Sequence, residues 1–283
     1  MVARGYSNVT RVSSLRDAHT TCNNRMFDVV VYEGGKQAEP LPRSMRFGQV
    51  GDNPYLVMVC TLKHAERSVV MQTINGGIDN LLVKPFAATL LIERINAMVH
   101  VRKSFVVAID YIGPERPVDR QNDPDLPLLA VPNTLRDKVV ESFDLDLTLQ
   151  AIRRANTQVN SQMIIQCMRR VTPTVQYITA IWEGGMKVDT MPHLDQLKRL
   201  MSTIERRLKG TPDEHVAELC SGMISVIDNL IRDNLSPSTK DIRLLQNLAQ
   251  SLHMSLNPDE KIAELSREIA GSVLDAARSS NGR

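Results

Sequence analysis

The segment Tyr55-Leu56-Val57-Met58-Val59-Cys60 is an uninterrupted apolar run. Similar runs occur at Phe27–Tyr32, which is β-branched and apolar apart from Asp28, and at Leu81–Val83. Strands that are apolar at every position are buried on both faces, as in a parallel sheet. Helical patterns alternate with these runs, which predicts right-handed βαβ units and a doubly wound parallel sheet. We expect strands at 8–12, 27–32, 55–60 and 81–83, and helices at 14–24, 64–75 and 87–103.

The composition is that of an ordinary globular protein. Hydrophobic residues make up 42% of the 283 residues and charged residues 23%, which is far from the composition of a disordered chain. This length predicts two domains or one large domain. No apolar run approaches the roughly 18–20 residues that span a bilayer, and the N-terminus lacks the apolar core of a signal peptide. We therefore expect a cytoplasmic protein with no membrane partner.

The charges are balanced in both halves of the chain. Residues 1–134 carry 15 Lys/Arg and 13 Asp/Glu, and residues 135–283 carry 19 of each. A protein whose main partner is nucleic acid needs a basic excess that neutralises phosphates. The balance argues against a nucleic-acid partner, and we find no helix-turn-helix with a basic recognition helix.

Residues 104–134 interrupt the alternation of strands and helices. They contain five prolines and the polar run Asp119-Arg120-Gln121-Asn122-Asp123. This composition predicts a linker or an extended arm. We therefore divide the chain into a first domain at 1–103, a linker or arm at 104–134, and a helical bundle domain at 135–283.

Everything after residue 135 has a helical pattern. Apolar residues recur at spacings of three and four, which is typical of the core-facing seam of an all-α bundle. Pro173 is expected to break or kink the first long segment. Thr211 with Glu214 three residues later predicts a capping box that opens a helix. Further helices are expected at 191–208, after Ser236-Pro237 and after Asn257-Pro258-Asp259-Glu260.

The cysteines give no sign of a metal or redox site. Cys22, Cys60, Cys167 and Cys220 are too far apart in the sequence to form a CxxC-type motif. Their surroundings are mostly apolar or helical, so we expect buried free thiols. We also find none of the motif residues of a catalytic output domain, and we expect a protein that is not an enzyme.

Four segments of the first 116 residues follow a particular order. One apolar run ends in an acidic residue at Phe27–Glu33, and the next ends in a hydroxyl residue at Val57–Thr61. A third run is followed by Lys-Pro within Gly77-Ile78-Asp79-Asn80-Leu81-Leu82-Val83-Lys84-Pro85-Phe86, and Phe105–Arg116 contains Tyr111-Ile112-Gly113-Pro114-Glu115-Arg116. Over roughly residues 4–103 this order resembles strands three to five of a response-regulator receiver domain, and Phe105–Arg116 looks like the tail of some alphaproteobacterial receivers. The resemblance implies a degenerate, N-terminally shortened, flavodoxin-like fold.

The resemblance implies roles for four positions. Receivers carry an Asp acceptor after strand three, two acidic residues after strand one that hold Mg²⁺, a hydroxyl residue after strand four and a Lys after strand five. Glu33 occupies the phosphoacceptor-equivalent position, and Thr61, Lys84 and Pro85 occupy the other receiver-site positions. Glutamate is not the usual acceptor, and the acidic pair has no counterpart. No cofactor is therefore expected, with Mg²⁺ only if the receiver is active.

Two interpretations of Glu33 stay open. Its carboxylate is either a permanent negative charge opposite Lys84 and Thr61, which partly mimics an activated state, or a simple ion-pair partner of Lys84 without a switching role. His64, which lies nearby in the sequence, is expected to be a solvent-facing helix residue rather than a catalyst.

The resemblance also leaves strand one and most of helix one without a counterpart. In the strand order 2-1-3-4-5 of such folds, strand one is central. The strand expected at 8–12 must then pair directly with 27–32, detach, or borrow a strand, and exposed apolar surface and a free edge invite a partner. The competing explanation is a start codon upstream of this sequence.

In the helical part, Ile204-Glu205-Arg206-Arg207-Leu208-Lys209-Gly210 is weakly similar to the His-x-x-Lys-Gly motif of histidine phosphotransfer domains. Arg206 stands where the phosphoryl-carrying His would be, and Lys209 and Gly210 form the Lys-Gly pair. A guanidinium stays protonated and cannot serve as that nucleophile. The resemblance implies a degenerate phosphotransfer position, and chance similarity is the alternative.

Together these patterns predict a phosphorylation-independent signalling adaptor of the two-component type that acts by protein-protein binding. The expected partners are signalling proteins of a two-component pathway, and a homodimer is a further hypothesis. The alternative function is a phospho-accepting response regulator whose N-terminal strand and acidic pair are missing from this chain. A transcriptional regulator is the third hypothesis.

Overall fold

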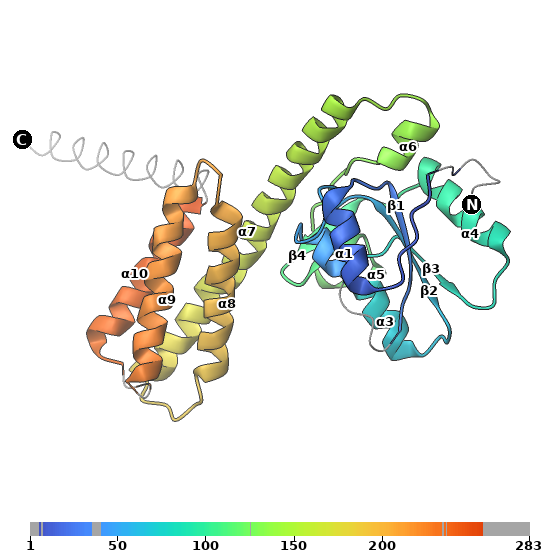
Figure 1. Cartoon of the computed structure of the whole chain (residues 1–283). Coiled ribbons are helices and arrows are strands. Elements are labelled where there is room, and N and C mark those ends of the chain that lie inside the picture. The colour runs from blue at the N-terminus through green and yellow to red at the C-terminus, as the bar shows by residue number, and fades with distance from the viewer. Residues whose placement is uncertain are drawn as a thin grey trace, which may run out of the picture. The chain divides into compact units, whose positions relative to one another are not determined.

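The computed structural model describes residues 6, 8–35, 41–124, 126–233, 235 and 237–256, without the side chains of residues 120 and 122. The chain forms two compact units, Met1–Val159 and Asn160–Arg283 (Figure 1). The described part of the first unit combines a parallel sheet with helices, and that of the second is helical. The expected order, an α/β part followed by an all-helical part, is therefore confirmed.

Three strands form the parallel sheet of the first unit: β1 (Val29–Glu33), β2 (Val57–Leu62) and β3 (Asn80–Val83). Their order is β1-β2-β3. Val29 lies opposite Val57, and Val59 lies opposite Asn80. Every residue of the central β2 is buried, as an uninterrupted apolar run requires. Three of the four expected strands are therefore confirmed.

One face of the sheet is covered by α1 (Leu15–Asn24), α2 (Leu41–Arg46) and α3 (Arg67–Asn75) (Figure 1). Ser14 caps α1, because its hydroxyl accepts the backbone N–H of Asp17. The core on this face contains the even-numbered residues of β2 together with apolar residues of the three helices.

The opposite face is covered by α4 (Ala88–His100) and α6 (Thr134–Val139). Val57 and Val59 of β2 pack here with residues of α4 and with Leu135 of α6. Successive residues of a strand point to opposite sides of the sheet, so β2 contributes to both cores. The predicted alternation of strands and helices thus yields helices on both faces.

Residues 8–12 do not form the expected strand. They lie outside every helix and strand, and Val9 and Val12 are 41% and 46% exposed. Tyr6 packs on the α4 face, where its hydroxyl donates to Asn96 at 2.6 Å, whereas α1 packs on the opposite face. Residues 8–12 thus lie between anchors on opposite faces of the sheet and pair with no described strand.

Residues 104–134 are not the expected linker or arm, because they fold onto the first unit. They form an antiparallel hairpin of β4 (Phe105–Ala108) and β5 (Tyr111–Pro114), followed by α5 (Pro117–Asn122). Phe105 is fully buried. The prolines fit this structure because Pro114 ends its strand and Pro117 opens its helix, where an N–H has no intrahelical partner.

One helix, α7 (Leu145–Glu183), contributes residues to both units. Its first part belongs to the first unit, where Ile152 is buried and the Tyr55 hydroxyl donates to Asn156 at 2.7 Å. The helical domain therefore does not begin at residue 135 as expected. Of the break or kink expected at Pro173, the break does not occur, because α7 continues through it to Glu183.

The second unit packs residues 160–183 of α7 with α8 (Met191–Leu208), α9 (Ala217–Arg232) and α10 (Thr239–Leu256). Each helix buries apolar residues, as the three-and-four spacing predicts. Contacts between neighbouring helices include the rings of Tyr177 and His193, which lie 4.7 Å apart, the ion pair of Lys198 with Asp228 at 2.6 Å, and the hydrogen bond from Gln246 to Glu183 at 3.3 Å. The helix expected after Asn257-Pro258-Asp259-Glu260 lies outside the described residues.

The predicted capping box before α9 does not form. The Glu214 carboxylate accepts the N–H of Gly210 at 3.1 Å, and the Thr211 hydroxyl donates to the carbonyl of Leu208 at 2.6 Å. A 3₁₀ turn, η2 (Glu214–Val216), follows, and α9 begins only at Ala217. The hydrogen-bonding groups are those of the motif, but they stabilise the turn between α8 and α9.

Candidate functional site

The carboxyl ends of the three parallel strands bring the receiver-site positions together. Glu33 ends β1 and lies opposite Thr61 in the register of β1 and β2. Lys84 directly follows β3, and its N–H donates to the carbonyl of Leu62 at 2.8 Å. Ligand-binding residues of open α/β sheets gather at this end, so we take this cluster as the candidate site.

Both oxygens of the Glu33 carboxylate are engaged by lysines. Lys84 Nζ lies 2.5 Å from Oε2, and Lys63 Nζ lies 3.1 Å from Oε1. The hydrogen bond from Lys84 and then that from Lys63 lower the pKa of Glu33 below its ordinary value. The sequence interpretation missed Lys63, although its position immediately after β2 places it at the same end of the sheet.

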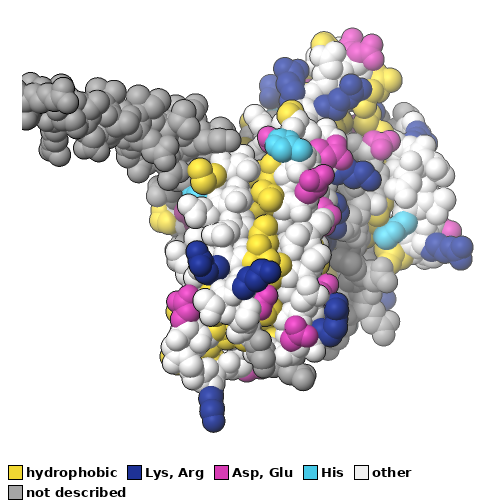
Figure 2. Space-filling model, turned by 90° about the vertical axis from the view of Figure 1, so that its left-hand side faces the viewer, with side chains coloured by type: hydrophobic (Ala, Val, Ile, Leu, Met, Phe, Trp, Pro, Cys, Tyr) yellow, Lys and Arg dark blue, Asp and Glu magenta, His cyan; other side chains and the backbone are white. Residues whose placement is uncertain are grey.

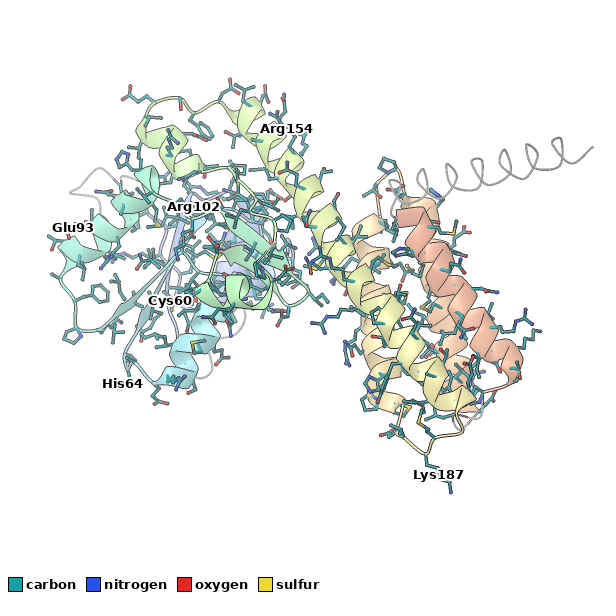
Figure 3. The ribbon with its side chains drawn as sticks, turned by 180° about the vertical axis from the view of Figure 1, so that it is seen from behind. Cys60, His64, Glu93, Arg102, Arg154 and Lys187 are labelled. Carbon is teal, nitrogen blue, oxygen red and sulfur yellow. The ribbon has the colours of Figure 1, made fainter. Side chains whose placement is uncertain are left out.

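The other predicted residues, Thr61 and Pro85, are not among the hydrogen-bond or ion-pair partners of the Glu33 carboxylate within the described part of the chain. Thr61 is buried, and its hydroxyl donates to the backbone carbonyl of Tyr32 at 3.4 Å. Pro85 is exposed and follows Lys84 through a cis peptide bond. His64 is exposed, but it precedes α3 instead of lying on a helix (Figure 3).

This cluster is an ion-paired group of three charges at the surface. Glu33 is 43% exposed, with Lys84 40% and Lys63 70% exposed, so water reaches all three groups. Within the described residues, no group of three or more His, Cys, Asp or Glu side chains is arranged to hold a metal ion. The four cysteines are buried free thiols, as predicted.

A second ionic cluster, which the sequence interpretation missed, lies at the opposite end of the sheet. Asp79, just before β3, accepts Arg46 Nη2 at 2.8 Å and Arg102 Nε at 2.8 Å, and it also accepts the N–H of Met58. Burial raises the pKa of Asp79, but the two guanidinium groups outweigh this effect and hold it below its ordinary value. Figure 3 shows Arg102 and His64 toward opposite ends of the first unit, with Cys60 between them.

The hairpin β4–β5 closes over this buried cluster. The ring of Phe105 lies 4.8 Å from the guanidinium of Arg46 and 5.1 Å from that of Arg102, a cation–π arrangement. Gly77 and Gly113 let the backbones approach, because a Cβ on Gly77 would lie 2.5 Å from the carbonyl oxygen of Ile112. Residues 105–116 are therefore part of the first unit's structure.

Tyr111 and Arg116, which belong to the Tyr111–Arg116 segment of the tail resemblance, make contacts on and beside the same hairpin. Arg116 stacks on Tyr111 at 3.4 Å, pairs with Asp119 at 2.6 Å and donates to Asn75 at 2.6 Å. The Tyr111 hydroxyl donates to the carbonyl of Pro114. Tyr111 and Arg116 of the tail segment therefore have structural roles in packing and hydrogen bonding.

In the helical unit, the degenerate phosphotransfer positions lie at the end of α8. Arg206 is exposed in the last turn, and Lys209 and Gly210 lie beyond Leu208, where the helix ends. Gly210 has a φ of +73°, the left-handed conformation that often terminates a helix. The Lys-Gly pair therefore acts as a helix stop. Figure 2 shows charged side chains of both signs on one face of this unit and an apolar stripe along it.

The comparisons with known proteins identify no relative: no protein-family model and no curated protein matches the chain. None of the helices in the described ranges has both the length and the apolar character needed to cross a membrane.

Proposed function

We propose that the chain is a phosphorylation-independent signalling adaptor whose first unit is a degenerate, flavodoxin-like receiver and which acts by binding other signalling proteins. The observation that carries this proposal is the engagement of Glu33 at the phosphoacceptor-equivalent position. Its two carboxylate oxygens pair with Lys84 and Lys63, so a glutamate held by two cations would stand where an active receiver carries its aspartate acceptor. The ion-paired carboxylate would keep a fixed charge pattern on the surface.

The arrangement of the strands supports the receiver part of the proposal. Three parallel strands place an acidic residue, a hydroxyl residue and a lysine at one end of the sheet, where open α/β folds bind ligands. Of the two interpretations of Glu33, the geometry favours the simple ion pair with Lys84. The other interpretation, a negative charge opposite both Lys84 and Thr61 that mimics an activated state, is less favoured because the Thr61 hydroxyl donates to the backbone carbonyl of Tyr32.

One observation favours the alternative, a phospho-accepting regulator that lacks a strand. No described backbone group bonds to the outward-facing N–H and C=O groups of Val29, Val31 and Glu33 on β1. A strand added at this edge would complete a larger sheet. If that strand brought acidic residues to the end of β1, it would supply the missing Mg²⁺ ligands.

The experiment exposes the purified full chain to a small-molecule phosphodonor with Mg²⁺ and measures the intact mass. We expect no added phosphoryl group on the wild-type chain or on Glu33→Asp, which has the usual acceptor side chain. A phosphorylated mass that disappears in Glu33→Ala would overturn the proposal and support the alternative. An active receiver treated in parallel controls for the donor.

A further inference from the structure

A cavity of about 180 Å³ lies beside the end of α4 in the first unit. Its lining comes from residues at the end of α4 and just after it, from Ala130, Val131 and Asn133, and from Arg136 of α6. One water needs roughly 10–15 Å³ of such space, so the cavity can take a small anion together with water. It lies near the amino end of the sheet, away from Glu33.

The lining of this cavity is basic. His100, Arg102, Lys103 and Arg136 contribute to it, and the described residues that line it include no Asp or Glu. Over the whole sequence, by contrast, 34 Lys/Arg are matched by 32 Asp/Glu. A wall with basic groups only therefore departs from the even mixture of charges elsewhere in the chain.

Several donors on this wall are available. The Arg136 side chain makes no hydrogen bond within the described part of the chain, although its charge acts on the carboxylate of Asp137 next to it; its backbone N–H donates to Asn133. Lys103 Nζ makes one bond, to the carbonyl of Glu115 at 3.3 Å, and an ammonium has three N–H groups. The five N–H groups of the Arg136 guanidinium and two N–H groups of the Lys103 ammonium can thus donate to a ligand.

The buried cluster behind the wall adds positive charge. The side chain of Arg102 is 7% exposed and lines the cavity, and it shares the single carboxylate of Asp79 with Arg46. Two guanidinium groups against one carboxylate leave an excess of one positive charge in a buried region, where screening is weak. An anion in the cavity would offset this excess.

We propose that this cavity binds a small phosphate-bearing anion, either inorganic phosphate or a phosphate monoester. A guanidinium binds two oxygens of a phosphate side by side, and an ammonium supplies a point charge, so Arg136 and Lys103 match a tetrahedral dianion. The inference does not rest on the proposed adaptor function, because it uses neither Glu33 nor its lysines.

A structural role for the same side chains predicts a different outcome. Cations near the carboxyl end of a helix are stabilised by the helix dipole, and His100, Lys103 and Arg136 lie near the end of α4. If that were their only role, their removal would lower stability and leave phosphate binding unchanged.

The test titrates the full chain with inorganic phosphate at constant ionic strength, with chloride as the balancing anion, and measures the dissociation constant by calorimetry. Arg136→Ala should weaken binding about tenfold or more, the loss expected for hydrogen bonds to a charged group, and Lys103→Ala should also weaken it. Arg94→Ala is the matched control, because Arg94 is an exposed arginine of α4 outside the cavity. Circular dichroism checks folding, and Arg136→Lys replaces Arg136→Ala if the alanine variant unfolds.

Glycerol phosphate, titrated in the same way, distinguishes the two sources of the phosphate group. Binding at least as tight as that of inorganic phosphate indicates a monoester, and weaker binding indicates the free ion; both support the site if Arg136→Ala weakens them. An adventitious ion only, with the same affinity in Arg136→Ala and Arg94→Ala, would overturn the proposal. So would the absence of phosphate binding to the wild-type chain.

Discussion

The two ends of the parallel sheet carry ionic clusters of the same composition, one carboxylate with two cations. At the carboxyl end, Glu33 is 43% exposed and pairs with two lysines. At the amino end, the side chain of Asp79 is 1% exposed and pairs with two arginines. The same combination of charges is thus exposed to water at one end of the sheet and buried at the other.

The difference shows how burial decides what an ion pair does. An exposed pair exchanges hydration for a weak, screened attraction and contributes little to stability. A buried charge is tolerated only when its partners and hydrogen bonds replace water, and Asp79 meets this condition with two guanidinium groups and a backbone N–H. The amino-end cluster is therefore part of the fold, whereas the carboxyl-end cluster can change without loss of the fold.

Asp79→Asn should have the largest effect, because it leaves two buried guanidinium groups facing a neutral amide. Removing one partner of a buried ion pair costs about 3–5 kcal/mol. Hydrogen exchange of the β2 amides reports the stability of the first unit. Fluorescence of Trp182, the single tryptophan, reports the unfolding of the second unit. Asp110→Asn changes an exposed carboxylate in the same way and is the control. Unchanged protection of β2 in Asp79→Asn would contradict the structural role of the cluster.

Gly77→Ala should have the next largest effect, because it disturbs the contact that holds the hairpin over the buried cluster. Its Cβ would lie 2.5 Å from the Ile112 carbonyl oxygen, and its φ is +85°, so we expect a loss of about 1–3 kcal/mol in urea unfolding. Gly48→Ala is the matched control, since Gly48 has a φ of +69° and nothing within 4 Å of a Cβ. Equal losses in the two variants would show that only the backbone conformation matters.

Glu33→Gln should have the smallest effect, although it makes the same chemical change as Asp79→Asn. We expect the urea midpoint at pH 7 to stay within experimental error of the wild type. The pKa of Glu33 is lowered in the folded chain from its ordinary value of 4.5. The ion pairs of Glu33 therefore stabilise the fold at pH values above 4.5, and this contribution disappears as the pH falls through the lowered pKa. A large drop in the midpoint of Glu33→Gln at pH 7 would show that exposure does not separate the two clusters.

The carboxyl-end cluster was predictable because local rules place it. Glu33 and Lys84 follow apolar runs, and parallel strands bring the residues that follow them to one end of the sheet. The amino-end cluster was not, because Arg46 lies on a short helix without a strong periodic signal and Arg102 lies just after a helix end. Only the tertiary fold brings these two residues to Asp79.

The remaining errors have the same origin in tertiary packing. The prolines of 104–134 suggested a linker, yet they occupy positions where a hairpin and a short helix accept them. The 8–12 segment has strand-like residues, but its anchors lie on opposite faces of the sheet. Pro173 does not end α7, which runs on to Glu183 with Val171 and Val175 buried on either side of it; the kink that the sequence also predicts there stays a prediction.

The division of α7 between the two units has a practical consequence for dissecting the chain. A fragment that ends at residue 103 or 134 would lose the part of α7 that belongs to the first unit, with buried Ile152 and with Asn156, which accepts the Tyr55 hydroxyl. A cut between 159 and 160 follows the division of the two units, but it exposes new helix ends whose backbone groups lose their intrahelical partners. No cleavage point within α7 therefore leaves both fragments undamaged, and proteases that attack loops should leave this helix intact until one of the units unfolds.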